Sequence, residues 1–194
     1  MTSPINERDF LIEKRRTSIR ELLMPYADSH ERTACMTLAE RDKYFMGAAL
    51  TLANAAALEG EVPVGCVIER DGVIIAAEYN GRETMRDAVY HAEMAAISEA
   101  CMKLGGWRLI GCTMYVTLEP CPMCAGAAWC ARLPRVVTGA KDNKAGAMGT
   151  LINLNSYPLN HKPNVTFGVR ERECREVLQN FFASRRIKRS TEEK

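Results

Sequence analysis

Hydrophobic positions along the chain follow two different periods. Over residues 42–58 they recur at helical spacing, which predicts an amphipathic helix. Residues 64–68 and 73–79 are short apolar runs typical of strands. Asp71-Gly72 lies between them and is a strong turn signal, because glycine adopts positive φ without steric cost. The chain therefore predicts a β-hairpin soon after the first of these helices.

Helical and strand patterns alternate through the rest of the chain. Strands are predicted over 112–118, 135–140 and about 165–169, and loops over 80–90 and 141–149. Helices are predicted from His91 to the Gly105-Gly106 pair, over 121–132, and over about 172–186. Such alternation with short joints is typical of an α/β fold. We expect a three-layer α/β/α sandwich around a mixed five-stranded sheet.

The first 39 residues precede this pattern. They are rich in mixed charge and show only a modest helical pattern around Phe10, Ile12, Ile19, Leu22 and Leu23. Three interpretations stay open: an added RNA-binding arm, a poorly ordered extension, or a misassigned start, since Met36 stands just before the regular pattern. We favour the last two. The expected organisation is an extension over 1–39, one domain over 40–189 and a tail over 190–194.

Composition agrees with a single enzyme domain. A chain of 194 residues, 47% of them hydrophobic, can bury one sizeable core, and a net charge of +2 means that any nucleic-acid-binding surface must be local. Eight scattered cysteines, the lack of a recognisable leading signal segment and the lack of an apolar run of membrane-spanning length predict a reduced, cytoplasmic protein without membrane association.

Four residues carry the candidate chemistry. His91, Cys121 and Cys124 would supply three zinc ligands, which leaves the fourth tetrahedral position for a water, as in catalytic zinc sites. The two cysteines are three residues apart and share a helix face, and a helix start favours the thiolates that zinc binds. Pro120 suits the entrance to that helix. We expect two facing helix starts to hold one zinc ion between them.

Glu93 is the spare carboxylate, two residues after His91, and we expect it to carry protons for the zinc site. Glu119 is a rival carboxylate, but its place before Pro120 favours a structural hydrogen bond. A Cys-x-x-Cys redox pair without zinc is an alternative for the cysteines. His30, His161 and the other cysteines fit ordinary structural roles.

The motif His91-Ala92-Glu93 with Pro120-Cys121-Pro122-Met123-Cys124 resembles the signature of zinc-dependent nucleobase deaminases. Further runs, over about residues 38–189, are similar to the bacterial tRNA-specific adenosine deaminases of the cytidine and deoxycytidylate deaminase superfamily. These runs are Glu61-Val62-Pro63-Val64-Gly65, Tyr79-Asn80, Trp107-Arg108-Leu109-Ile110, Tyr115-Val116-Thr117-Leu118-Glu119-Pro120, Cys124-Ala125-Gly126-Ala127, Gly139-Ala140-Lys141-Asp142-Asn143-Lys144, Asn160-His161 and Phe181-Phe182.

The resemblance implies a cytidine deaminase-like fold and hydrolytic deamination of adenosine to inosine at the wobble position of a tRNA anticodon, with tRNA arginine as the favoured substrate. It also implies a homodimer with one zinc ion per subunit. Glu93 would take a proton from the activated water and deliver it to adenine N1 as C6 is attacked. Asn80 and the backbone N–H of Ala92 would bind the flipped nucleoside, and Asp142 and Lys144 would approach its ribose and phosphate. An exposed turn is the alternative for the last two.

The last predicted helix carries the expected RNA contacts. Phe182, beside Phe181, and the basic residues Arg185 and Arg186 are similar to the family's RNA-facing element, although a basic end of this kind is often only a solvated tail. Two other functions stay open. One is a zinc deaminase of a free base or nucleoside such as guanine or cytosine, and the other is a catalytically silent RNA-binding zinc subunit.

Overall fold

The computed structural model of the chain describes residues 6–192, with side chains described up to residue 187. Five strands form one mixed sheet in the order β2-β1-β3-β4-β5. β1 runs antiparallel to β2 and β3, whereas β3, β4 and β5 are parallel. The strands are β1 (Gly65–Arg70), β2 (Val73–Tyr79), β3 (Cys112–Leu118), β4 (Arg135–Ala140) and β5 (Asn164–Thr166). The expected mixed five-stranded sheet is confirmed.

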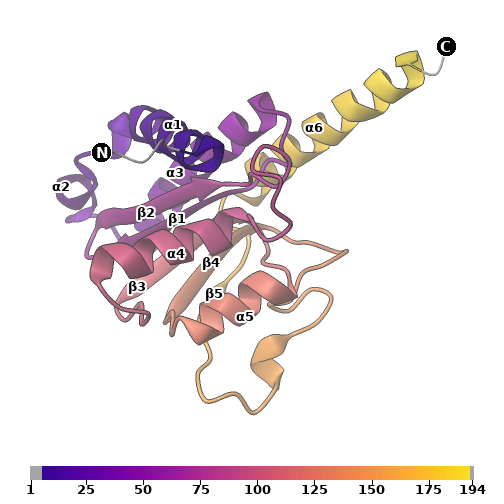
Figure 1. Cartoon of the computed structure of the whole chain (residues 1–194). Coiled ribbons are helices and arrows are strands. Elements are labelled where there is room, and N and C mark those ends of the chain that lie inside the picture. Colours follow the sequence, from indigo (N-terminus) through magenta and orange to yellow (C-terminus); the bar gives the residue numbers. More distant parts are fainter. Residues whose placement is uncertain (1–5, 193–194) are drawn as a thin grey trace.

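Helices cover both faces of this sheet (Figure 1). They are α1 (Glu7–Leu22), η1 (Met24–Tyr26), α2 (Ser29–Thr33), α3 (Leu38–Leu58), α4 (Ala92–Leu104), α5 (Pro122–Cys130), η2 (Leu154–Ser156) and α6 (Glu171–Glu192). α3 and α6 pack on one face with Val67, Tyr115 and Val137, and α4 and α5 pack on the other with Ile68, Met114 and Val136. Side chains of a strand point alternately to the two faces, so both faces carry a hydrophobic core. The three-layer sandwich is confirmed.

Several element boundaries differ from those predicted. α3 begins at Leu38 because Thr37 and Glu40 form a capping box, in which the Glu40 carboxylate accepts from the Thr37 N–H at 2.8 Å. α6 continues to Glu192, so most of the predicted tail over 190–194 is helical, and residues 193–194 lie outside the described part. β5 ends at Thr166, three residues before the predicted end of the strand.

The N-terminal segment forms helices. From the sequence we favoured a poorly ordered extension or a misassigned start for this segment. α1, η1 and α2 span residues 7–33, and α1 buries Arg15 and Ile19. Ile19 joins the core on the α3 side of the sheet. Residues 1–5 of this segment lie outside the described part, and the domain boundaries and the true start site stay predictions. No helix of the described residues combines the length and hydrophobicity needed to cross a membrane.

The site lies at one edge of the sheet, and strand direction explains why. β1 is antiparallel to both β2 and β3, so β2, β3 and β4 all end at the same edge. Asn80 follows β2, Glu119 follows β3 and Asp142 lies two residues after β4. α4 and α5 begin at this edge too. The carboxyl ends of parallel strands are the usual place for an α/β active site.

Close packing at Gly65 fixes β1 beside this edge. A Cβ atom on Gly65 would lie 2.0 Å from the Ala49 carbonyl oxygen of α3, so no larger residue fits without moving the helix. The backbone N–H of Gly65 donates to the Thr117 hydroxyl of β3 at 3.1 Å. The start of β1, and with it the preceding residue Val64, is therefore held against both layers.

Candidate zinc centre and active site

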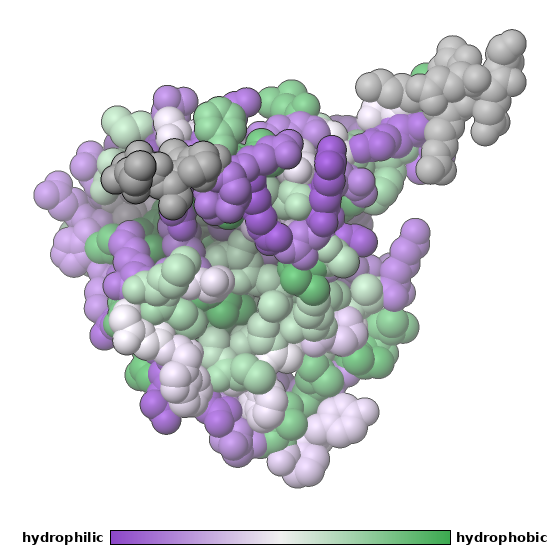
Figure 2. Space-filling view, viewed as in Figure 1, coloured by the Kyte–Doolittle hydropathy of each residue, from purple (hydrophilic) through white to green (hydrophobic). Residues whose placement is uncertain are grey.

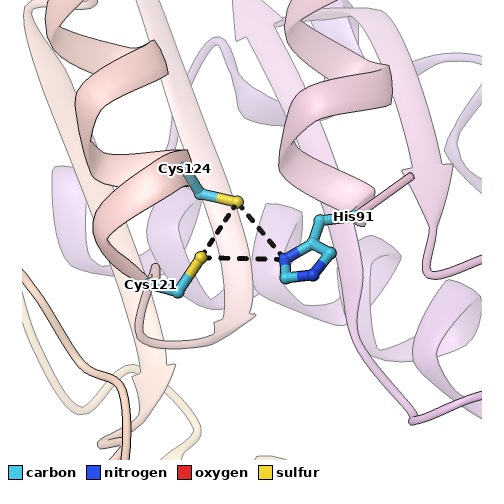
Figure 3. Close-up of side chains that lie close together, drawn as sticks. All are labelled: His91, Cys121 and Cys124. Atoms are coloured by element: carbon cyan, nitrogen blue, oxygen red, sulfur yellow. Dashed lines mark hydrogen bonds between the residues drawn. The ribbon is translucent and has the colours of Figure 1, made fainter. Parts of the chain in front are cut away.

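Two helix starts face each other across the site (Figure 3). His91 is the N-cap of α4 and Cys121 is the N-cap of α5, and both residues have extended backbones. Neither side chain caps its own helix, so the imidazole and the thiol are turned toward each other. Cys124 follows one turn later. Pro122, rather than the predicted Pro120, occupies the first turn of α5, where its missing N–H costs nothing.

The three side chains are spaced for a tetrahedral metal ion. His91 Nδ1 lies 3.7 Å from Cys121 Sγ and 3.5 Å from Cys124 Sγ, and the two sulfur atoms are 3.6 Å apart. Usual zinc bond lengths with tetrahedral angles require about 3.8 Å between two sulfur ligands and about 3.6 Å between sulfur and nitrogen. The donor set therefore fits zinc and leaves one coordination position without a protein ligand.

The electrostatics of the two thiols favour metal binding. The hydrogen bond between them lowers the pKa of Cys121 to about 4, and the neighbouring His91 acts in the same direction. The same bond, with burial, raises the pKa of Cys124. The pair thus shares one proton, which a bound cation displaces. Both sulfur atoms lie at the start of α5, where the helix dipole further stabilises negative charge.

Glu93 lies in the first turn of α4 and is 4% exposed. Burial raises the pKa of its carboxyl group, so Glu93 holds a proton more readily than a surface glutamate. It lines a cavity of about 150 Å³ together with His91 and Cys121. Val62, Val64, Asn80, Arg82, Leu118, Glu119, Asp142 and Ala145 complete the lining.

Glu119, the rival carboxylate, has the structural hydrogen bonds that its sequence position favoured. It is 2% exposed, and its Oε1 accepts from the backbone N–H groups of Met148 and Thr150, each at 3.0 Å. Its Oε2 accepts from the N–H of Asp142 at 3.3 Å. Both oxygens of Glu119 thus hold the loop after β4, whereas the Glu93 carboxylate interacts with the Cys124 thiol of the metal site.

Asn80 lines the same cavity as His91 and Cys121 and is held from several sides. Its N–H donates to the Val64 carbonyl at 2.9 Å, and its side-chain amide donates to Glu61 Oε2 at 3.0 Å. Glu61 is fully buried, and its other oxygen accepts from the Thr84 N–H at 2.7 Å. Sequence reasoning gave Glu61 no role. Its signal was its place at the start of the family-like run Glu61-Val62-Pro63-Val64-Gly65.

The other predicted substrate-binding residues, Ala92, Asp142 and Lys144, differ in their place relative to the cavity lining. Ala92 is fully buried at the first helical position of α4, beside both His91 and Glu93. Asp142 lines the cavity, and its Oδ1 accepts from the N–H of Lys144 at 2.8 Å. Lys144 is exposed and lies outside the cavity lining. The turn therefore brings Asp142 to the site and leaves the Lys144 side chain at the surface.

A second groove, of about 290 Å³, adjoins the cavity along α6. It shares Val62, Asn80 and Arg82 with the zinc cavity. The rest of its lining is Gly60, Glu61, Glu83, Phe181, Phe182, Arg185 and Arg186. The structure thus brings the three predicted RNA-contacting residues of α6 next to the site. Arg82 was missed, although it lies only two residues after Asn80 in the predicted loop.

Comparisons with known proteins agree with this geometry. The family model of the cytidine and deoxycytidylate deaminase zinc-binding region matches residues 39–140. The tRNA-specific adenosine deaminase of Bacillus subtilis (strain 168) is 48% identical over 155 residues, which are 79% of this chain and 96% of the relative. Because the matched zinc-binding region contains His91, Cys121 and Cys124 in metal-binding geometry, the protein binds one zinc ion.

Solved structures give the same picture. A tRNA:A34 deaminase that edits A to I at the wobble position of transfer RNA matches with a TM-score of 0.68 and 43% identity, covering 70% of this chain and 99% of that one. A guanine deaminase from Nitrosomonas europaea matches with a TM-score of 0.62 and 25% identity, covering 73% of this chain and 84% of that one. The chain belongs to the cytidine and deoxycytidylate deaminase zinc-binding family and, within it, to the tRNA-specific adenosine deaminases.

Proposed function

We propose that the protein hydrolytically deaminates adenosine to inosine at the wobble position of a tRNA anticodon, with an arginine tRNA as the favoured substrate. The observation that carries this proposal is the buried carboxylate of Glu93 beside three zinc-spaced ligands, in a chain 48% identical to a tRNA-specific adenosine deaminase. Water and adenosine react to give inosine and ammonia, so no further cofactor is required.

Glu93 carries the protons of this reaction. Zinc would be held by His91, Cys121 and Cys124, and it would supply a nucleophilic water at neutral pH by lowering the pKa of that water. Glu93 accepts the proton of that water and delivers it to adenine N1 while C6 is attacked, and it later assists the departure of ammonia. The raised pKa of its buried carboxyl group suits this exchange, because Glu93 then holds an accepted proton more readily than a surface glutamate would.

The substrate base enters the cavity and its neighbours stay outside. Asn80 and the backbone N–H of Ala92 bind the base, and Asp142 and Lys144 face its ribose and phosphate. The groove along α6 shares Asn80 with the cavity and takes the flanking nucleotides. An anticodon loop suits this arrangement, since its bases are unpaired and turn outward at lower cost than those of a duplex.

The substrate test is an assay of the zinc-loaded protein on an arginine-tRNA anticodon stem-loop with adenosine at the wobble position. Free adenosine, adenine, guanine and cytosine are assayed alongside it by nucleoside mass spectrometry. We expect inosine in the stem-loop alone. Turnover of a free base alone would replace this proposal with the free-base deaminase. No turnover with zinc bound would favour the silent RNA-binding subunit.

The α6 groove predicts a specific binding defect. Phe182 is 45% exposed and lines the groove, and stacking of a base on an aromatic ring contributes about 1–3 kcal/mol. We expect Phe182→Ala to weaken stem-loop binding by roughly 5- to 150-fold in fluorescence anisotropy. Phe10→Ala, which removes an exposed ring outside this groove, is the control.

Binding by the unaltered protein should also weaken steeply with salt, and a flat salt response would contradict phosphate contacts from Arg185 and Arg186.

We also propose a homodimer that uses the surface of α4 and α5. Figure 2 shows hydrophobic surface gathered over these two helices. A Cβ on Gly126 of α5 would meet open space, so Gly126→Glu places a charge on this surface without a clash. We expect a dimer of the 21.6 kDa chain in light scattering, and a monomer for Gly126→Glu. Leu58→Glu, at a residue 90% exposed on α3, should stay dimeric.

We place this activity in the cytoplasm. A tRNA substrate is found there, and the eight cysteines are all free thiols in the structure, as a reducing compartment requires.

A further inference from the structure

Arg15 of α1 is a buried cation that contacts the end of β2. It is 5% exposed, and its Nε donates to Glu78 Oε2 at 2.9 Å. Its terminal nitrogen Nη2 donates to the carbonyl oxygens of Tyr79 and Asn80, the latter at 3.0 Å. The guanidinium carbon lies 3.5 Å from the centre of the Tyr79 ring. A residue outside the family match, which begins at residue 39, thus bonds directly to a residue of the active-site cavity.

These bonds complete the restraint of Asn80. Its N–H is bonded to Val64 and its side-chain amide N–H to Glu61, and Arg15 bonds the backbone carbonyl group. β2 is one of the two edge strands of the described sheet, and the donor comes from α1 instead of from another strand. A buried carbonyl left without a donor is destabilising, because it loses its hydrogen bonds to water without replacing them. Arg15 satisfies two carbonyls at once and pairs its own charge with Glu78.

α1 also contacts the loop that joins Asn80 to His91. Arg8 Nη2 lies 2.6 Å from Asp87 Oδ2, and the loop is closed by the bond from the Gly81 N–H to the Tyr90 carbonyl at 3.1 Å. Both ends of the loop carry site residues. α1 is bonded to Asn80 at the start of this loop and to Asp87 within it. It therefore limits how far Asn80 can move relative to the metal ligand His91.

We propose that Arg15 is a positioning residue, through which the N-terminal helix fixes Asn80 in the geometry that binds the substrate base. This inference rests on the proposed function, because it takes Asn80 as the base-binding residue. Arginine suits the task better than lysine, since its planar fork bonds one carboxylate and two carbonyls simultaneously. The N-terminal segment is then part of the active-site scaffold rather than an accessory.

The kinetic test compares Arg15→Met with Arg20→Met, which removes an exposed arginine from the same helix. With zinc content and folded fraction measured for each variant, we expect Arg15→Met to lower kcat/KM on the stem-loop roughly 10- to 100-fold, chiefly through KM, and Arg20→Met to leave it unchanged. In an Asn80→Ala background, Arg15→Met should lower kcat/KM by less than about twofold, since the side chain that Arg15 positions has been removed. An undiminished loss in that background would overturn the proposal.

A second readout does not depend on activity. Hydrogen exchange of the segment 79–91 should be faster in Arg15→Met than in Arg20→Met, while exchange in β3 is equal in the two. Equal exchange in 79–91 would overturn the proposal even if the enzyme had another substrate, and a protein inactive on the stem-loop would refute only the proposed function. Should Arg15→Met fail to fold, Arg15→Lys keeps the charge, loses the fork and takes its place in both measurements.

Discussion

Glu93→Gln is expected to abolish deamination while one zinc ion per chain remains bound. The substitution keeps the size of a side chain that is 4% exposed and removes its capacity to accept and release a proton. General acid–base catalysis typically raises a reaction rate about 10²- to 10⁴-fold. Glu93 transfers protons in two steps of this reaction, so we expect a loss of rate in the upper part of this range. Glu93 is not among the three side chains placed to hold the metal, so zinc content should not change.

The matched comparison is Glu119→Gln. Glu119 is also a buried carboxylate in the cavity lining, but its oxygens accept hydrogen bonds from backbone N–H groups of the loop after β4. An amide at this position turns an acceptor into a donor, so we expect a lower melting temperature and near-normal turnover per zinc-loaded, folded molecule. Single-turnover assays with zinc measured on the same samples separate the two cases. Turnover retained in Glu93→Gln and lost in Glu119→Gln would exchange the two roles.

The zinc centre could be predicted from the sequence because its parts are local. Cys121 and Cys124 are three residues apart, His91 and Glu93 are two apart, and a helix start orients each pair. The fold followed from the alternation of helical and strand patterns, because each element buries a face of its own. The sequence motifs alone did not show that the two pairs lie side by side. They do so because β2, β3 and β4 end at the same edge of the sheet.

The supporting residues could not be predicted in the same way, because their partners are distant along the chain. Arg15 lies 63 to 65 residues before the groups that it contacts, and Glu61 lies 19 residues before Asn80. A buried arginine in a segment of mixed charge has the same local sequence as an exposed one. What distinguishes Arg15 from Arg20 is its burial and its hydrogen bonds to Glu78, Tyr79 and Asn80. The early start of α3 is different, since Thr37 and Glu40 show it in the sequence itself.

Cys124→Ala is expected to release the zinc, stop turnover and destabilise the protein. Cys124 is fully buried on α5, and with Cys121 and His91 it ties the start of α5 to that of α4. Two remaining ligands hold zinc far more weakly than three. At free zinc 100 to 1,000 times the dissociation constant, binding stabilises the folded chain by about 2.7 to 4.1 kcal/mol, and this contribution is lost.

Cys66→Ala separates loss of the metal from loss of a buried thiol. Cys66 is also fully buried, in the core between the sheet and α4, and burial raises its pKa. Its replacement should lower the free energy of unfolding by about 1 kcal/mol through lost packing alone, and leave zinc content and turnover unchanged. Metal analysis and thermal unfolding with and without a chelator give the comparison. The chelator should lower the melting temperature of Cys66→Ala and leave that of Cys124→Ala unchanged, because only the first protein has zinc to lose. A chelator effect of equal size in both would mean that the metal stabilising this fold is held by other residues than the three at the helix starts.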